Sequence, residues 1–189
     1  IGCGAGELSL AVARGNPTSR VIGVDVSPDL VDAARQRGGA LTNVGFEFAH
    51  AGSWAPIDFK PDRLISRHGV MFFDAPRGAF THLREISAPG AELVFSCFRS
   101  SKLNPWATQL ASLLELPPAK DPLAPGPFAF ADKDHVAAIL GDAGWREVTH
   151  TEVDFAYVAG MGEDPVEDAL NMFTRIGPAA PVLRGLAPD

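Results

Sequence analysis

The sequence predicts an α/β protein built on a doubly wound, mostly parallel β-sheet. Two observations support this fold class: short apolar segments of strand length alternate with segments of helical periodicity, and turn residues separate them. In addition, glycines at positions 2, 4 and 6 form a loop of the kind that joins a strand to a helix at the ligand-binding edge of such sheets. We therefore expect residues 1–189 to form a single domain around one sheet.

The glycine loop, IGCGAG over residues 1–6, leads directly into a predicted helix. Apolar residues recur at helical spacing over 7–14, and the sequence GNP at 15–17 ends the helix. Glycines this dense allow positive φ angles and a close approach of the backbone to a ligand. Such a loop normally follows a strand, and Ile1 alone precedes it, so we expect the first strand to be largely missing and the domain to be incomplete at its amino end.

The next eighty residues repeat the strand–helix rhythm. RVIGVD at 20–25 is almost continuously apolar, which is typical of a strand covered on both faces. Ser27 and Pro28 form an N-cap and a first helical position, and Gly38 with Gly39 stops that helix. Further strands are predicted over 46–48, 62–66 and 92–98, and a further helix over 77–86.

Residues 99–131 depart from this rhythm and are interpreted as a lid or substrate insertion within the domain. A helix is predicted over 105–116 from the spacing of its apolar residues. The proline-rich segment 117–127 suits an ordered loop or a lid hinge, since too little chain follows it for a domain linker.

After this insertion the sequence predicts two helices with a strand between them. A helix capped by Asp132 ends at Gly144, and a last amphipathic helix begins at Asp164 and is closed by the sequence GP at 177–178. Apolar and polar residues alternate over 146–158, which predicts an antiparallel C-terminal edge strand or hairpin.

Composition excludes several classes of function. The net charge is -7 and the Lys and Arg residues are scattered, which argues against nucleic acid as the main partner. Cys3 and Cys97 are too few for a disulfide framework and lack zinc-ligand spacing, so we predict no metal site and a reducing, cytoplasmic location. No apolar run approaches the roughly 18 residues that a membrane span requires.

An acid at the end of the second predicted strand indicates the kind of ligand. Asp25 lies roughly 20 residues after the glycines, where a carboxylate can accept from both hydroxyls of a ribose. The loop and the acid together predict a nucleoside-bearing cofactor. A dinucleotide fingerprint would need glycine at position 7, where Glu7 would repel a pyrophosphate, so a cofactor without phosphate is favoured.

Three stretches together resemble the class I S-adenosylmethionine-dependent methyltransferases: IGCGAGELSL, VIGVDVS and DRLISRHGVMFFDAPRGAFTHLREISAPGAELVF. The likeness covers nearly the whole chain and points to the broad group that includes the ubiquinone and menaquinone biosynthesis methyltransferases. It implies a Rossmann-like fold, S-adenosylmethionine as the cofactor, and methyl transfer to a small-molecule acceptor.

The resemblance also implies where the cofactor would be held. Gly2, Cys3 and Gly4 would lie against its methionine part and ribose. Asp25 would bind the ribose hydroxyls, and Val26 would lie against the adenine.

One departure from the family concerns the adenine. Many relatives carry an aspartate after the third strand that accepts from the adenine amino group, and the matching residue here is Gly52. Backbone groups, Ser53 and apolar contact with Trp54 are expected to hold the adenine instead. Packing of Trp54 in the core or on the surface is an equally open alternative.

Ser66, Arg67 and His68 follow the fourth strand, where such families place residues between cofactor and acceptor. Ser66 is expected on the cofactor side. Methyl transfer from a sulfonium depends mainly on positioning, and a base is needed only if the acceptor must lose a proton. His68 is the candidate base, since imidazole titrates near neutrality, and a structural histidine is the alternative. The other histidines, at 50, 82, 135 and 150, are interpreted as surface groups.

The acceptor is expected to be a bulky, partly apolar small molecule. Met71–Phe73 and Phe128–Phe130 are candidates for lining its pocket, with core packing as the more common fate of such residues. Two other functions stay open at this point: a cofactor-binding module without catalysis, and a nicotinamide-dependent oxidoreductase, which Glu7 disfavours.

Overall fold

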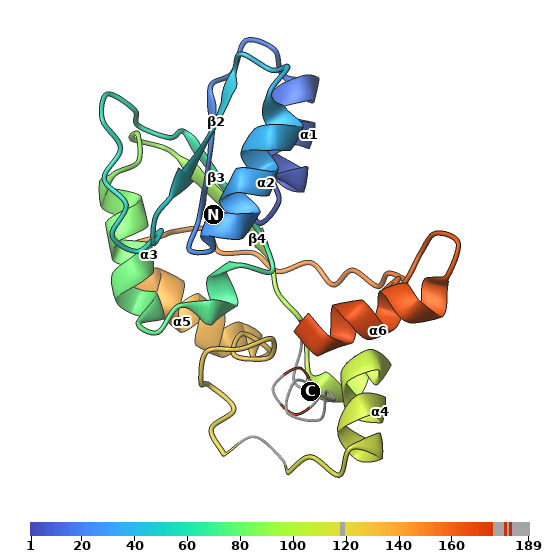
Figure 1. Ribbon diagram of the computed structural model, residues 1–189. Helices are drawn as coiled ribbons and strands as arrows, with labels where there is room; N and C mark the ends of the chain where they lie inside the picture. Colours follow the sequence, from blue (N-terminus) through green and yellow to red (C-terminus); the bar gives the residue numbers. More distant parts are fainter. Residues whose placement is uncertain (118–119, 176–179, 181, 183–189) are drawn as a thin grey trace. The chain divides into compact units, whose positions relative to one another are not determined.

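A computed structural model describes residues 1–117, 120–175, 180 and 182 (Figure 1). The chain divides into two compact units. Unit 1 comprises Ile1–Cys97 and Asp134–Val148, and unit 2 comprises Phe98–Lys133 and Thr149–Asp189. Among the described residues, no helix is both long and apolar enough to cross a membrane.

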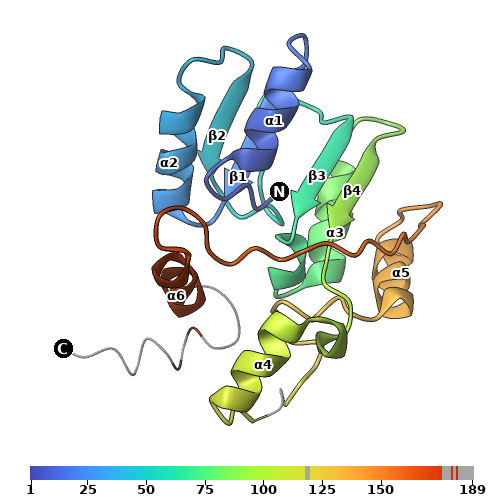
Figure 2. The ribbon, with the colours of Figure 1, turned by 90° about the vertical axis from the view of Figure 1, so that its right-hand side faces the viewer.

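Unit 1 contains four strands that pair in parallel (Figure 2). β1 (Val21–Asp25) pairs with β2 (Val44–Phe48), and β3 (Arg63–Arg67) pairs with β4 (Glu92–Ser96). The parallel strands predicted from the sequence are confirmed, together with the α/β class.

The four strands form two sheets of two strands each, where the sequence predicts a single sheet. Residues 1–3 lie between the pairs: the Cys3 amide donates to Val24 O at 3.0 Å, and the Ile1 amino group donates to Ile65 O at 2.8 Å. A segment this short makes one hydrogen bond to each side and forms no ladder. The two pairs are therefore bridged without becoming one continuous sheet.

Helices α1 (Glu7–Gly15) and α2 (Pro28–Gly38) lie against β1 and β2 (Figures 1 and 2). The predicted N-cap of α2 is confirmed, because the Ser27 hydroxyl accepts from the Leu30 amide. After β3 the chain forms a short 3-10 turn over Val70–Phe72 and then α3 (Pro76–Glu85).

Helix α5 (Lys133–Asp142) and the turn after it hold α3 through polar contacts. Arg77 forms an ion pair with Asp142 at 2.6 Å, and the Trp145 indole donates to Phe80 O at 3.0 Å. These contacts join the two separate chain segments that make up unit 1.

The core beneath the glycine loop is centred on Phe46 of β2. Its ring packs with Leu10 of α1 and with Val31 and Ala34 of α2. Three backbone sites without side chains surround the same ring: a Cβ would come within 2.7 to 3.0 Å of it at each of Gly6, Gly23 and Gly38. The ring therefore occupies a space that these glycines leave open, and one of them belongs to the glycine loop.

Unit 2 is organised differently. Its described helices are the 3-10 turn Ser101–Leu103, α4 (Pro105–Leu113) and α6 (Pro165–Arg175). Four aromatic rings form a cluster with centroid separations of 5.1 to 6.1 Å, contributed by Phe98, Trp106, Phe128 and Tyr157.

The antiparallel strand or hairpin predicted over 146–158 is not formed, because these residues have no regular secondary structure. Arg99 instead pairs with Glu152 at 2.9 Å and with Asp154, so side-chain ion pairs take the place of a backbone ladder. The predicted helix over 105–116 ends earlier, at Leu113. Part of the loop 117–127 and the predicted helix stop at 177–178 lie outside the described residues.

Candidate functional site

The glycine loop has a left-handed backbone at all three of its glycines. The φ angles of Gly2, Gly4 and Gly6 are 58°, 52° and 85°, a region that side chains other than glycine rarely adopt. Gly2 and Gly6 are enclosed by neighbours, whereas a Cβ at Gly4 would meet nothing within 4 Å. The loop is thus anchored at both ends and open in its middle, which suits contact with a ligand.

Asp25, at the carboxyl end of β1, connects this loop to the start of α2. Its Oδ2 accepts from the Gly4 amide at 2.7 Å, and its Oδ1 accepts from the Ser27 amide at 3.0 Å. An ionised carboxylate has about four acceptor sites, so each oxygen retains capacity for a further donor such as a ribose hydroxyl. The sequence predicted the acid, and the structure adds its second role in holding the loop.

The turn after β3 packs directly on the glycine loop. Ser66 is buried, with 4 % of its surface exposed, and its hydroxyl accepts from the Gly69 amide at 3.2 Å. A Cβ at Gly2 would lie 3.0 Å from Cα of Gly69, so the two backbones meet at a glycine–glycine contact. His68, which directly precedes Gly69 in the sequence, adopts a left-handed φ of 60° and donates its amide to Ser96 O at 3.1 Å. Ser66 and His68 therefore lie next to the predicted cofactor loop.

Electrostatics set the protonation of three groups in this region. Burial, aided by the Arg67 charge, lowers the pKa of His68, so its imidazole is neutral at pH 7. The hydrogen bond and charge of Arg67 lower the pKa of Glu7, with which Arg67 forms an exposed ion pair. Burial and then the Asp25 charge raise the pKa of Cys3 to about 11, so this residue is a neutral thiol and no nucleophile.

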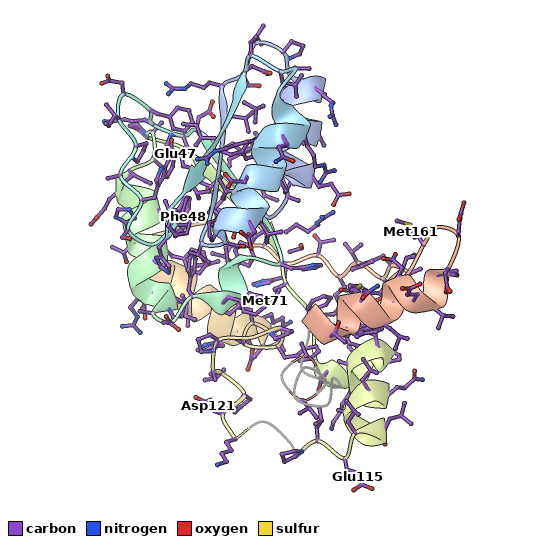
Figure 3. The ribbon with its side chains drawn as sticks, viewed as in Figure 1. Glu47, Phe48, Met71, Glu115, Asp121 and Met161 are labelled. Atoms are coloured by element: carbon purple, nitrogen blue, oxygen red, sulfur yellow. The ribbon has the colours of Figure 1, made fainter. Side chains whose placement is uncertain are left out.

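The residues predicted to contact the adenine differ in their exposure. Val26 is 60 % exposed directly after Asp25, and Ser53 is exposed beside Gly52. Trp54 is instead buried, and its indole donates to Glu47 Oε2 at 2.7 Å (Glu47 is labelled in Figure 3). Trp54 is therefore packed within the protein, which was the alternative to its contact with the adenine.

His82, expected at the surface, is half-buried on α3. One of its ring nitrogens lies 2.7 Å from Trp54 O, so the side chain holds the loop after β2. Helical periodicity alone did not reveal this partner, which lies 28 residues away in the sequence.

The apolar residues predicted to line an acceptor pocket lie mainly in cores. Met71 and Phe73 are buried in unit 1, and Phe130 is buried in unit 2. Phe72 is 53 % exposed, and Phe128 belongs to the aromatic cluster of unit 2.

An open cavity of about 380 Å³ lies beside Gly52 in unit 1. Its lining residues come from the loop after β2 and from the start of α3: His50, Gly52, Phe73, Asp74, Ala75, Gly78 and Ala79. The sequence predicts His50 to be a surface group, and both His50 and Asp74 are exposed. Within the residues that the structure covers, no group of three His, Cys, Asp or Glu side chains could hold a metal ion.

Comparisons with known proteins agree with this geometry. Residues 1–90 match a protein-family model described as "Methyltransferase domain". The matched residues include the glycine loop, Asp25, Gly52 and His68, all within unit 1.

Curated relatives cover about half of the chain. The trans-aconitate 2-methyltransferase of Variovorax paradoxus is 30% identical over 93 residues, which are 49% of this chain and 35% of that protein. The malonyl-[acyl-carrier protein] O-methyltransferase 1 of Ilyobacter polytropus is 28% identical over 98 residues, 52% of this chain and 36% of that protein. The chain thus spans about a third of the length of these relatives.

A solved structure extends the likeness in fold beyond this half. Magnesium protoporphyrin IX methyltransferase from Synechocystis PCC 6803, with bound SAH, superposes with a TM-score of 0.55 at 21% identity. The superposition covers 76% of this chain and 60% of that one. Residues 1–90 are thus similar to methyltransferase domains, and the sequence resemblance points to the same family.

Proposed function

We propose that the protein transfers a methyl group from S-adenosylmethionine to a small-molecule acceptor. The observation that carries this proposal is the 2.7 Å hydrogen bond from the Gly4 amide to Asp25, which ties the open glycine loop to the acid at the end of β1. A ribose bound by that acid would extend over the loop. The family match over residues 1–90 supports the same conclusion.

Each residue of the loop region has a specific role in this proposal. Gly2, Cys3 and Gly4 hold the methionine part and the ribose through their backbone, and the neutral Cys3 thiol adds no competing charge. Asp25 accepts from the ribose hydroxyls, and the exposed Val26 lies against the adenine. Gly52 and Ser53 lie along the adenine edge, and Ser66 supports the cofactor side of the turn that carries His68.

When bound, the cofactor supplies a methyl group on a positively charged sulfur. The thioether that is left after transfer would need no proton, so the protein would contribute much of the catalysis by positioning the acceptor. His68 would take the proton from a hydroxyl acceptor, and its lowered pKa keeps the imidazole neutral and ready to do so. An ionised carboxylate acceptor would need no base.

We assign the acceptor side to residues 99–131, as a lid or substrate insertion in a single domain. The aromatic cluster around Phe98, Trp106 and Phe128 supports a partly apolar acceptor. We also propose a reducing, cytoplasmic location, since two cysteines, Cys3 and Cys97, are too few for a disulfide framework.

Glu7 argues against a nicotinamide dinucleotide. Its lowered pKa keeps it ionised at the first position of α1, where a pyrophosphate would approach the helix N-terminus. Arg67 offsets this charge, but the ion pair still occupies the approach.

Calorimetric titration with S-adenosylhomocysteine and with NAD tests the proposal. We expect binding of S-adenosylhomocysteine and no binding of NAD. A screen for transfer of a tritiated methyl group, with trans-aconitate, other carboxylic acids and phenols as acceptors, then identifies the acceptor. Binding without transfer to any acceptor would support a non-catalytic module, and NAD binding would support an oxidoreductase.

A further inference from the structure

β2 is the outer strand of its pair, because among the described residues no strand pairs with its other side. The Ala49 amide donates to Asp25 O at 3.0 Å, which turns position 49 toward β1. The backbone groups of successive residues alternate in direction along a strand. The positions whose N–H and C=O point away from β1 are therefore Val44, Phe46 and Phe48. Such a row of backbone groups on an open edge is a template for pairing with another chain.

Arg35 of α2 closes this edge at its middle residue. α2 packs alongside β2 (Figure 2), and both Nε and Nη2 of Arg35 donate to Phe46 O, at 3.1 and 3.0 Å. Nη1 donates to Asp32 Oδ1 at 2.9 Å, so the neighbouring carboxylate orients the guanidinium. A carbonyl oxygen has two lone pairs. Arg35 fills both, and Phe46 O has no capacity left for the amide of a partner strand.

The edge is otherwise suited to pair with a second copy of itself. In an antiparallel pair of two β2 strands centred on Phe46, each Phe46 would exchange N–H···O bonds with its counterpart. Phe48 would lie opposite Val44 of the second copy, and a pair of an aromatic and a β-branched residue is favourable in this position. Glu47 would lie opposite Gly45, so no like charges would face each other. Phe48 is 62 % exposed, and pairing would remove part of this apolar surface from water.

We propose that Arg35 is a guard residue that prevents β2 from pairing with β2 of a second copy of this chain. The two charge-assisted hydrogen bonds to Phe46 O must break in both copies before the strands can pair. Charged side chains commonly protect sheet edges. Here the charged group acts by occupying the backbone acceptor at the centre of the edge. This role does not depend on the proposed function.

Sedimentation velocity at increasing protein concentration, combined with amide hydrogen exchange, tests this role. Arg35→Leu removes all the donors, and we expect it to self-associate about 10- to 100-fold more tightly than the wild type. The Phe46 and Phe48 amides should become protected from exchange as this variant associates, whereas in the wild type they should exchange fast at every concentration. Arg35→Lys, which keeps the charge but has a single donor nitrogen, should associate to an intermediate degree. It decides the question if the leucine variant does not fold.

Two further variants control for the added apolar surface. Arg14 is an exposed arginine of α1, and Arg14→Leu places the same side chain elsewhere on unit 1, so it should behave as the wild type. Phe48→Pro removes an outward N–H without breaking a bond to β1, and in combination with Arg35→Leu it should reverse the association. Thermal unfolding checks that each variant is folded.

Three results would overturn the role of Arg35. The first is wild-type association in the folded Arg35 variants, with fast exchange of the Phe46 and Phe48 amides. The second is association of Arg35→Leu that Phe48→Pro does not reverse, because another surface would then be responsible. The third is slow exchange of these two amides in concentrated wild-type protein, because the edge would then pair although Arg35 is present.

Discussion

Units 1 and 2 differ in what determines their structure. In unit 1, backbone contacts decide the positions of functional groups: glycines meet glycines or the Phe46 ring, and amides donate to Asp25. Unit 2 has no strand among its described residues and is held by aromatic rings and the ion pairs of Arg99. It also leaves several large apolar side chains 60 to 69 % exposed: Val153, Phe155, Val166 and Leu170.

This difference parallels the distribution of family similarity. The family match covers residues 1–90, which all belong to unit 1. Backbone-determined geometry tolerates few substitutions, because a glycine in a left-handed or crowded position has no equivalent replacement. Side-chain clusters can be rebuilt with other residues. Under the proposed function, unit 1 would serve the cofactor and unit 2 would serve the acceptor.

Phe46→Ala should have the largest effect. Loss of a buried phenylalanine ring is expected to lower the free energy of unfolding by about 3–5 kcal/mol. Because Gly6 contacts this ring, binding of S-adenosylhomocysteine should weaken as well. Urea unfolding and calorimetry measure the two effects. Trp106→Ala, in the aromatic cluster of unit 2, is the control and should keep wild-type affinity. Equal losses of affinity would contradict the division between the units.

His68→Asn tests whether unit 1 also takes part in acceptor activation. Asparagine tolerates the left-handed φ of this position but cannot act as a base. With a hydroxyl acceptor we expect turnover to fall by about 100-fold or more. The affinity for S-adenosylhomocysteine should stay the same.

The pH profile of wild-type turnover sharpens this test. If His68 is the base, the neutral imidazole is the active form, and burial lowers the pKa of His68. Turnover should therefore persist below the ordinary histidine pKa and decline as the pH falls through the lowered value. Unchanged turnover in His68→Asn would make His68 a structural residue.

Asp25→Asn should weaken the cofactor site without unfolding unit 1. One of the two carboxylate oxygens becomes an amide nitrogen and can no longer accept from Gly4 or Ser27, nor from a ribose hydroxyl. Loss of a charged hydrogen bond costs about 1.5–3 kcal/mol, or roughly a 10- to 150-fold weaker affinity for S-adenosylhomocysteine. Asp29→Asn, on the exposed first turn of α2, is the control. Wild-type affinity in Asp25→Asn would refute its assignment to the ribose.

Gly23→Ala should destabilise unit 1 through a steric clash alone. The added methyl would lie 2.7 Å from Cδ1 of Phe46 and 3.0 Å from Cβ of Cys3. Overpacking of this kind costs about 1–3 kcal/mol. Gly45→Ala on the neighbouring strand meets nothing within 4 Å and should cost nothing. Equal urea midpoints for the two variants would show that the Phe46 ring moves aside at little cost. The glycine at position 23 would then not determine the packing of this core.

The ion pair of Glu7 and Arg67 should have the smallest effect. A double-mutant cycle with Glu7→Gln and Arg67→Gln is expected to give a coupling of about 0.2–1 kcal/mol, because both side chains are more than half exposed. The pKa of Glu7 is lowered in the folded protein, so this coupling is complete above the ordinary carboxyl pKa and is lost as the pH falls through the lowered value. Added salt should also reduce it. A coupling free energy that changes with neither pH nor salt concentration would exclude an electrostatic contact.

Much of unit 1 was predictable because its signals are local. The N-cap at Ser27, the strand ending at Asp25 and the helix after the glycine loop all depend on residues a few positions apart. The strand predicted over 146–158 was wrong because alternation describes any extended segment. A strand also needs a partner for its backbone, and here Glu152 and Asp154 bind Arg99 instead.

The sequence by itself determined the glycine positions, the acid at a strand end and the resemblance to methyltransferases, since these follow from backbone freedom and short-range spacing. Only the tertiary structure decided which distant groups meet. Three contacts illustrate this: the hydrogen bond between Asp25 and Gly4, the packing of the Phe46 ring against Gly23, and the position of the His50 ring beside Gly52. Close packing selects such contacts from many chemically similar candidates, and no local pattern encodes that choice.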